Sequence, residues 1–136
     1  MEAIHKWMAA LVAAAVLSGC AGKTETVNRD GPAAREALSW YQEILAGDTA
    51  AAHARLHPDA ARKVTQAVLD RKVRIMVTRW ALENPEVFVT SSQERQESAV
   101  VHVAIRGNRK GGKTHRITDG VTLKPMGNAW RIWMNP

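Results

Sequence analysis

The stretch SAVVHVAIR, residues 98–106, decides the fold class, because apolar side chains occupy every second position in it. A period of two predicts a β-strand that buries one face. The expected buried face consists of Ala99, Val101, Val103 and Ile105. The opposite face consists of His102, Ala104 and Arg106. The sequence therefore predicts a half-buried strand that needs partners on both sides.

The residues around this strand supply those partners. Residues 107–112 are rich in glycine and basic residues and predict a turn. The residues after that turn alternate again, with a β-bulge expected at Asp119-Gly120. Further strands are expected over residues 87–90, 113–124 and 129–134. We therefore expect an antiparallel sheet of about four strands.

The chain before residue 87 follows a helical period instead. Pro32 suits a first helical turn, Gly47 ends that helix, and Asp48 is a candidate N-cap for a second, short helix. A third helix is expected over residues 59–83, with a weak point near Lys72, where β-branched residues gather. Helices followed by an antiparallel sheet predict an α+β fold for residues 32–136, with the helices packed on a curved sheet.

The first nineteen residues predict an export signal. An uncharged apolar run extends from Trp7 to Leu17, about eleven residues, which is too short for the roughly 20 that span a bilayer. The run ends in Leu17-Ser18-Gly19-Cys20, which resembles the bacterial lipobox. In that motif the cysteine thiol is diacylated and the preceding bond, here Gly19–Cys20, is cut. The resemblance implies a lipoprotein signal peptide over residues 1–19.

Cys20 is the only cysteine, so the chain holds no internal disulfide. The alternative to lipidation is a buried thiol at the end of an apolar helix. Residues 20–31 are polar and aperiodic and predict a flexible tether behind the lipid. Because Ala21 rather than aspartate follows the cysteine, the resemblance implies an outer-membrane lipoprotein that faces the periplasm.

The chain has 19 Lys and Arg against 13 Asp and Glu, a formal net charge of +6 that removal of the leader does not change. In an exported protein this charge favours phospholipid headgroups, lipopolysaccharide or an acidic protein surface as partner, and not nucleic acid. A solvated basic surface without a partner is the alternative interpretation.

Several short features resemble one known family. Gly47-Asp48 begins an Ala-rich segment that ends in Leu56-His57-Pro58, and the chain closes with a strand, a turn at Gly127 and Trp130-Arg131-Ile132. This order resembles small bacterial lipoproteins of unknown function with a nuclear transport factor 2-like, cystatin-like domain. Here the closing segment is one residue longer after the glycine. The resemblance covers most of residues 32–136 and implies a cone with one concave pocket; it implies no reaction, because the fold hosts many functions.

Residues 107–114, GNRKGGKT, match the phosphate-loop pattern G-x-x-x-x-G-K-[ST]. A phosphate loop needs a helix directly after Lys-Thr, whose N-terminal amides hold the phosphates. The following residues show a β pattern, so we interpret the match as a hairpin tip. The same region is strongly basic and is the candidate contact for an anionic partner; its basic residues are Arg106, Arg109, Lys110, Lys113 and Arg116. The alternative is that these charges only protect the hairpin from edge pairing.

No catalytic, metal or cofactor site emerges from the remaining polar residues. His53 and His57 have helical ligand spacing but lack a third ligand. Asp119 suits a bulge, and Tyr41 is expected to fill the core. Glu94 and Glu97 fall in a polar turn.

Trp130 and Trp133 lie three residues apart on a strand, so they point to opposite faces. We take Trp133 as the candidate exposed aromatic contact, although the pattern also allows Trp130 to face outward. The sequence thus predicts an anchored, non-catalytic binding or scaffold module of undetermined oligomeric state. The alternatives are a small-ligand carrier or enzyme that uses the concave pocket, and a subunit of a secretion or conjugation apparatus. A cone filled by large apolar side chains would favour the first hypothesis, and a hollow one lined by polar groups the second.

Overall fold

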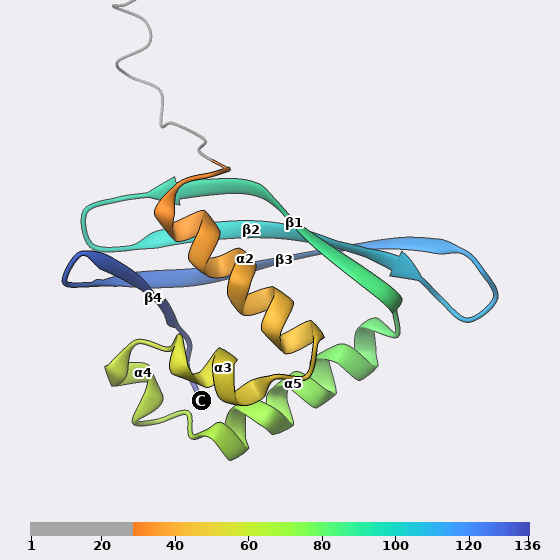
Figure 1. Ribbon diagram of the computed structural model, residues 1–136, viewed down its shortest axis with the longest axis horizontal. Coiled ribbons are helices and arrows are strands. Elements are labelled where there is room, and N and C mark those ends of the chain that lie inside the picture. The colour runs from red at the N-terminus through yellow and green to blue at the C-terminus, as the bar shows by residue number, and fades with distance from the viewer. Residues whose placement is uncertain (1–28) are drawn as a thin grey trace, which may run out of the picture.

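The computed structural model describes residues 29–136, so the expected signal peptide, Cys20 and most of the expected tether lie outside the described residues. Helices come first and a four-stranded antiparallel sheet follows, which confirms the predicted α+β class (Figure 1). The helices are α2 (Pro32–Leu45), α3 (Thr49–Ala54), α4 (Pro58–Ala61) and α5 (Gln66–Trp80). The strands are β1 (Glu83–Glu94), β2 (Ala99–Asn108), β3 (Thr114–Met126) and β4 (Ala129–Trp133).

Helix α2 begins and ends where the sequence predicts. Pro32 occupies its first turn, and Gly47, just beyond its end, has φ +78°, a value that favours glycine. Its first turn is also capped from far along the chain, because the amide N–H of Ala33 donates to Glu94 Oε1 at 2.9 Å. The buried face of α2 is Ala33, Ala34, Ala37, Trp40, Tyr41 and Ile44. Small residues at its start let the helix lie close to the sheet.

The third predicted helix is wrong in its boundaries. Residues 59–83 form two helices, because the Thr65 hydroxyl accepts the amide of Val68 at 3.3 Å and so caps a new start for α5. Helix α5 then runs unbroken through Lys72, where a break was expected. Burial of Leu69, Val73 and Trp80 outweighs the small helix penalty of its β-branched residues. It ends at Ala81, in the left-handed conformation (φ 50°).

Asn84 and Pro85, which follow the predicted helix directly, belong to β1, and this strand is much longer than the predicted 87–90. Proline is tolerated because β1 is an edge of the sheet, whose strand order is β1-β2-β3-β4. The predicted bulge at Asp119-Gly120 is also wrong: β2 and β3 pair without interruption, with Val103 opposite Asp119. The irregularities lie in β1, between Glu83 and Glu86 and between Val89 and Ser91.

The helices cover one face of the sheet (Figure 1). The predicted burial of β2 is confirmed for Ala99, Val101, Val103 and Ile105, which pack against α2 and α5 side chains in one core. Ala104, expected on the outer face, is buried as well, because Phe88 and Thr118 lie opposite it on the two neighbouring strands. The core also takes in Trp40, Tyr41, Ile44, Leu69 and Trp80. Large apolar side chains therefore fill the space between helices and sheet.

The segment after α3 closes the free edge of β4. The His57 amide donates to the carbonyl of Ile132 at 2.7 Å, and the Ile132 amide donates to the carbonyl of Arg55 at 2.9 Å. The Arg55 guanidinium reaches back to α2, with Glu43 at 2.8 Å and Glu36 at 3.1 Å. This ion cluster joins α2, the α3–α4 connection and the last strand.

Candidate functional site

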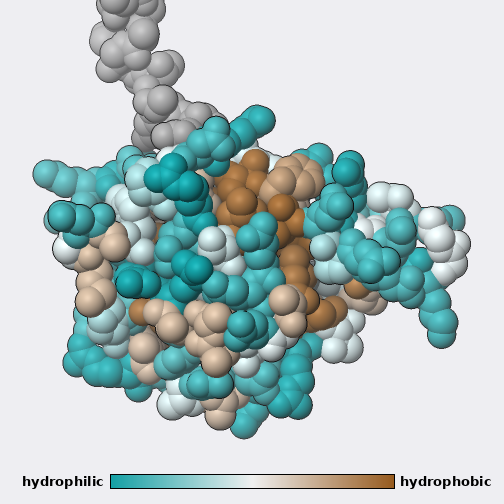
Figure 2. All heavy atoms as spheres, in the orientation of Figure 1, coloured by the Kyte–Doolittle hydropathy of each residue, from teal (hydrophilic) through white to brown (hydrophobic). Residues whose placement is uncertain are grey.

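The β2–β3 hairpin is the most prominent projection of the described domain. It extends beyond β1 and the end of α5, at the right of Figure 1, and appears as a hydrophilic arm in Figure 2. The arm places the five predicted contact residues together: Arg106 and Arg116 lie opposite each other on its two strands, and Arg109, Lys110 and Lys113 lie at its tip.

The structural setting of residues 107–114 differs from that of a phosphate loop. Gly107 is a buried residue near the end of β2, and a Cβ there would lie 2.9 Å from the Glu83 carbonyl oxygen. Gly111 and Gly112 take positive φ angles of 109° and 84° in the turn. Strand β3 begins at Thr114, where a phosphate loop requires a helix. Each glycine of the match therefore has a local structural reason.

The five arm cations have no carboxylate partner within residues 29–136. Glu86 lies opposite Arg106 across β1 and β2, yet no ion pair joins them. Arg109 Nε is buried without a hydrogen-bond partner among the described residues. Several arginines outside the arm do pair with acidic side chains: Arg55 with Glu36 and Glu43, Arg62 with Asp59, and Arg74 with Asp70. The arm thus concentrates positive charge that the rest of the domain does not compensate.

One aromatic ring extends the basic surface along the helix-free face of the sheet. The Arg116 guanidinium lies over the ring of Phe88 at 5.6 Å, a cation–π contact. Phe88 is 40% exposed, so the pair presents a flat, positively charged and partly apolar surface. Phe88 was not among the predicted contact residues; its pairing with Ala104 on the outer face of the sheet places it there.

Trp133, the predicted aromatic contact, is half-buried and already covered within the chain. The ammonium of Lys124 lies 3.6 Å from the ring centroid, and His57 packs edge-on at 5.6 Å. Trp130 packs against the hydrophobic core. The question that the sequence left open thus has an answer, with Trp130 toward the core and Trp133 away from it, while a role of Trp133 in partner contact stays a prediction.

Sequence reasoning missed the pairing of Tyr41 with Asp119. The phenol of Tyr41, on α2, donates to Asp119 Oδ2, on β3, at 2.6 Å. Burial raises the pKa of Tyr41 far above its usual value, and the hydrogen bond to Asp119 adds to this shift. Tyr41 therefore stays protonated. Its expected place in the core is confirmed, but it also fixes a carboxylate on the helix-facing side of the sheet.

Asp119 lies at the edge of an open hollow between α5 and β3 with a volume of about 470 Å³. Its lining combines two cations, one carboxylate and three apolar side chains: Lys72, Ile75, Met76, Arg79, Trp80 and Asp119. The core cluster fills the interior beneath it. The hollow is thus a surface feature at one end of the helix layer.

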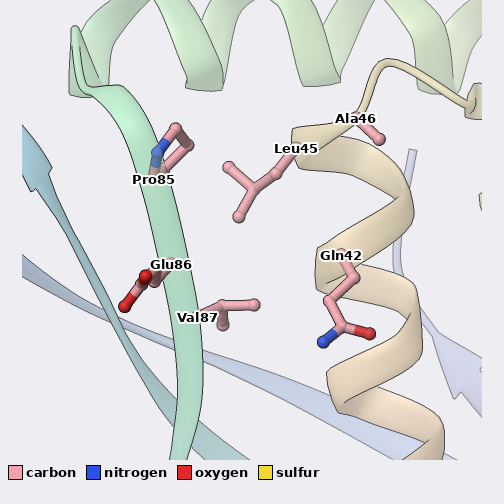
Figure 3. Close-up of a pocket in the computed structure, with 6 residues that line it drawn as sticks. All are labelled: Gln42, Leu45, Ala46, Pro85, Glu86 and Val87. Atoms are coloured by element: carbon pink, nitrogen blue, oxygen red, sulfur yellow. The ribbon is translucent and has the colours of Figure 1, made fainter.

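A second hollow of about 490 Å³ separates the end of α2 from β1. Leu45 and Val87 face each other across it, Gln42 lies on the helix side, and Glu86 points away (Figure 3). Figure 2 shows an apolar seam along the same boundary. This groove has apolar walls and lacks converging charged groups.

The two histidines with ligand spacing serve other contacts. His53 Nε2 lies 2.8 Å from the carbonyl oxygen of Val64, and His57 Nδ1 accepts the amide of Asp59 at 3.2 Å and caps α4. Glu94, expected in a turn, ends β1 and caps α2. Within residues 29–136, no three His, Cys, Asp or Glu side chains cluster as metal ligands would. No helix in that range is long and apolar enough to cross a bilayer.

Neither a protein-family model nor a curated protein matches the chain. Solved structures do. A putative NTF2-like transpeptidase from Campylobacter jejuni is 11% identical, with a TM-score of 0.50 over 73% of this chain and 94% of that one. A five-substitution variant in an NTF2 design series is 13% identical, with a TM-score of 0.50 over 73% and 90%. A SEC-C motif containing protein from Rhodopseudomonas palustris is 16% identical, with a TM-score of 0.50 over 69% of each chain.

At these identities the likeness concerns the fold alone. It supports an NTF2-like domain, with helices against an open antiparallel sheet, as the closing-strand motif implied. Such a fold is compatible with a binding or scaffold module and specifies neither ligand nor reaction.

Proposed function

We propose that this chain is a bacterial envelope lipoprotein, anchored through Cys20, whose folded domain is a non-catalytic binding module. Its basic arm, the β2–β3 hairpin with Arg106, Arg109, Lys110, Lys113 and Arg116, docks on an anionic partner. The partner is an acidic envelope protein or an anionic headgroup layer, and not nucleic acid. The anchor rests on the Leu17–Cys20 motif, and the outer-membrane location on Ala21.

One observation supports the docking surface above all: the arm cations lack carboxylate partners, whereas Arg55, Arg62 and Arg74 have them. Exposed like charges within about 10 Å of one another add to a local positive potential at physiological salt. Such a potential attracts and orients an acidic surface and speeds encounter with it. The long hairpin carries these charges away from the body, where a flat partner surface can reach them (Figure 1).

The packing of the domain interior favours this function over a ligand-filled cone. Trp40, Tyr41, Ile44 and Leu69 occupy the space between helices and sheet. We propose no reaction for the domain, and we assign the Tyr41–Asp119 hydrogen bond a structural role between α2 and β3. The role of the domain is therefore recognition through its surface.

Crosslinking in intact cells, followed by mass spectrometry, tests the docking surface. We expect the Arg109→Gln, Lys110→Gln, Lys113→Gln triple variant to lose captured neighbours that the wild type retains. A charge-matched variant, Arg62→Gln with Lys63→Gln and Arg71→Gln, removes three cations from the helical layer and should keep those neighbours. The proposal is wrong if the two variants capture the same set as the wild type.

A further inference from the structure

The hollow between α5 and β3 holds charged groups that the fold does not use. Lys72 and Arg79 line it from α5, and neither has a carboxylate partner among residues 29–136. Asp119 lines it from β3, and its Oδ2 accepts the hydrogen bond from the Tyr41 phenol. Oδ1 of Asp119 has no partner in the part of the chain that the structure describes. Two cations and one carboxylate oxygen therefore remain available to a bound molecule.

The rest of the lining is apolar. Ile75 is 55% exposed, on a helix that buries Leu69 and Val73 on its other side. Met76 and Trp80 form the wall below it, and Trp80 is 9% exposed. An apolar group placed here would remove Ile75 and Met76 from water, which is favourable in proportion to the area covered. The volume of about 470 Å³ is that of a site for a small molecule.

Charge and shape together define the ligand class. We propose that the hollow binds a free amino acid with an apolar side chain: Lys72 and Arg79 bind its carboxylate, its ammonium donates to Asp119, and its side chain packs against Ile75, Met76 and Trp80. Two cations against one carboxylate give the lining a net charge of +1. The carboxylate of the ligand should therefore contribute more to the affinity than its ammonium does. The bond from Tyr41 holds Asp119 in place, so its free oxygen is oriented before binding. This site is separate from the basic arm and does not depend on the anchor.

Ligand titration of the full chain tests the site directly. L-Phenylalanine carries all three groups, 3-phenylpropionate lacks the ammonium, and phenethylamine lacks the carboxylate. Methyl NMR signals of Ile75 and Met76 report occupancy, and calorimetry reports affinity. We expect phenylalanine to bind with a Kd of about 1 mM or lower, and each truncated ligand to bind about tenfold more weakly or worse.

Variants assign the contacts. Lys72→Gln with Arg79→Gln should weaken phenylalanine binding about tenfold or more, whereas Arg71→Gln, on the same helix but outside the lining, should leave it unchanged. Asp119→Asn still accepts the Tyr41 hydroxyl, and it should abolish the preference for phenylalanine over 3-phenylpropionate. Lys72, Arg79 and Asp119 are exposed or half-exposed, so the variants should fold.

Two results would overturn the proposal. The first is the absence of any shift of the Ile75 and Met76 signals up to about 20 mM phenylalanine, some twentyfold above the expected Kd. The second is an equal affinity for phenylalanine of the double variant, Lys72→Gln with Arg79→Gln, and of the control variant, Arg71→Gln. Neither result bears on the basic arm, whose test uses other residues and another readout.

Discussion

Tyr41 is the only tyrosine of the chain, and its hydroxyl lies 2.6 Å from Asp119 Oδ2 between the helix layer and the sheet. Burial and this hydrogen bond raise the pKa of the phenol. The unfolded chain has the ordinary tyrosine value of 10.0, so the folded state binds the proton more tightly. The associated stability is fully present below pH 10 and is lost as the pH rises above it.

We therefore expect the phenolate absorbance of Tyr41 to appear only as the protein unfolds. Above pH 10 the free energy of unfolding should fall by about 1.4 kcal/mol per pH unit more steeply in the wild type than in Tyr41→Phe. Ultraviolet titration and urea unfolding at pH 9 to about 11 measure both effects. Titration of the phenol near pH 10 in the folded protein would contradict the buried pair.

Gly107 is the first glycine of the phosphate-loop match, and close packing against β1 explains why a glycine is needed there. A Cβ at this position would meet the Glu83 carbonyl oxygen at 2.9 Å, Leu82 Cβ at 3.1 Å and Pro85 Cα at 3.3 Å. Most of these atoms are backbone of β1 and cannot move independently. We expect Gly107→Ala to lower the free energy of unfolding by about 1–3 kcal/mol, as overpacking does.

Gly120→Ala is the matched control for this prediction in urea unfolding. Its Cβ would meet mainly His102 Nδ1, at 3.0 Å, and the exposed imidazole can rotate away. The control should therefore change the stability by less than about 0.5 kcal/mol. Equal losses in the two variants would mean that the approach of β1 to Gly107 is looser than the structure shows.

At the scale of elements, one arginine joins three parts of the helix layer and sheet. Arg55 follows α3, binds Glu43 and Glu36 on α2, and lies beside Ile132 of β4 through its carbonyl group. Its side chain is 29% exposed, whereas that of Arg62, paired with Asp59, is 76% exposed. Only the Arg55 ion pairs are sheltered enough from water to contribute measurably to the stability of the fold.

Arg55→Met should lower the free energy of unfolding by about 1–2 kcal/mol, because it leaves the half-buried Glu43 without a cation and Glu36 with only Arg131, at 3.7 Å. Arg62→Met removes an exposed pair and should cost about 0.5 kcal/mol or less. Chemical unfolding of both variants in the same buffer makes the comparison. A smaller loss for Arg55→Met than for Arg62→Met would show that the cluster does not hold these elements together.

The sequence predicted elements whose signals are local. The alternation in residues 98–106, the N-cap at Asp48 and the glycine after α2 all act within a few residues, and the structure confirms them. Residues 59–83 were assigned to one helix because their apolar spacing continues through the break, and the cap at Thr65 looks like an ordinary polar residue. The length of β1 was missed because Pro85 argues against a strand unless the edge position is known.

The two candidate sites also differ in how local their sequence signals are. The basic arm is continuous in sequence, so its five cations could be named from sequence alone. Asp119 was interpreted as part of a bulge, because its partner Tyr41 lies 78 residues earlier and only the register of the sheet brings the two together. In the sequence alone, Lys72 and Arg79 look like any other basic residues of a helix. Only the fold shows that they line a hollow together with Asp119 of β3.

Over the whole molecule, the charges are strongly segregated. Residues 62–80 and 106–116 contain eleven of the 19 Lys and Arg but only one of the 13 Asp and Glu. The rest of the chain therefore has eight basic and twelve acidic residues. Arg29, the first described residue, donates to the Thr90 carbonyl on β1, at the end of the sheet away from α5 (Figure 1). The basic segments thus lie away from the point where the expected tether would join the domain.

This arrangement would suit the proposed anchored protein, whose basic arm would point away from the tether. The proposal depends most on acylation of Cys20. Growth with radiolabelled palmitate, followed by cell fractionation, is the most direct test. We expect label in the wild type, mature protein that begins at residue 20, and loss of both label and processing in Cys20→Ser. Absence of label in the wild type, or a Cys20→Ser protein that is still cut after Gly19 and still fractionates with membranes, would contradict the account.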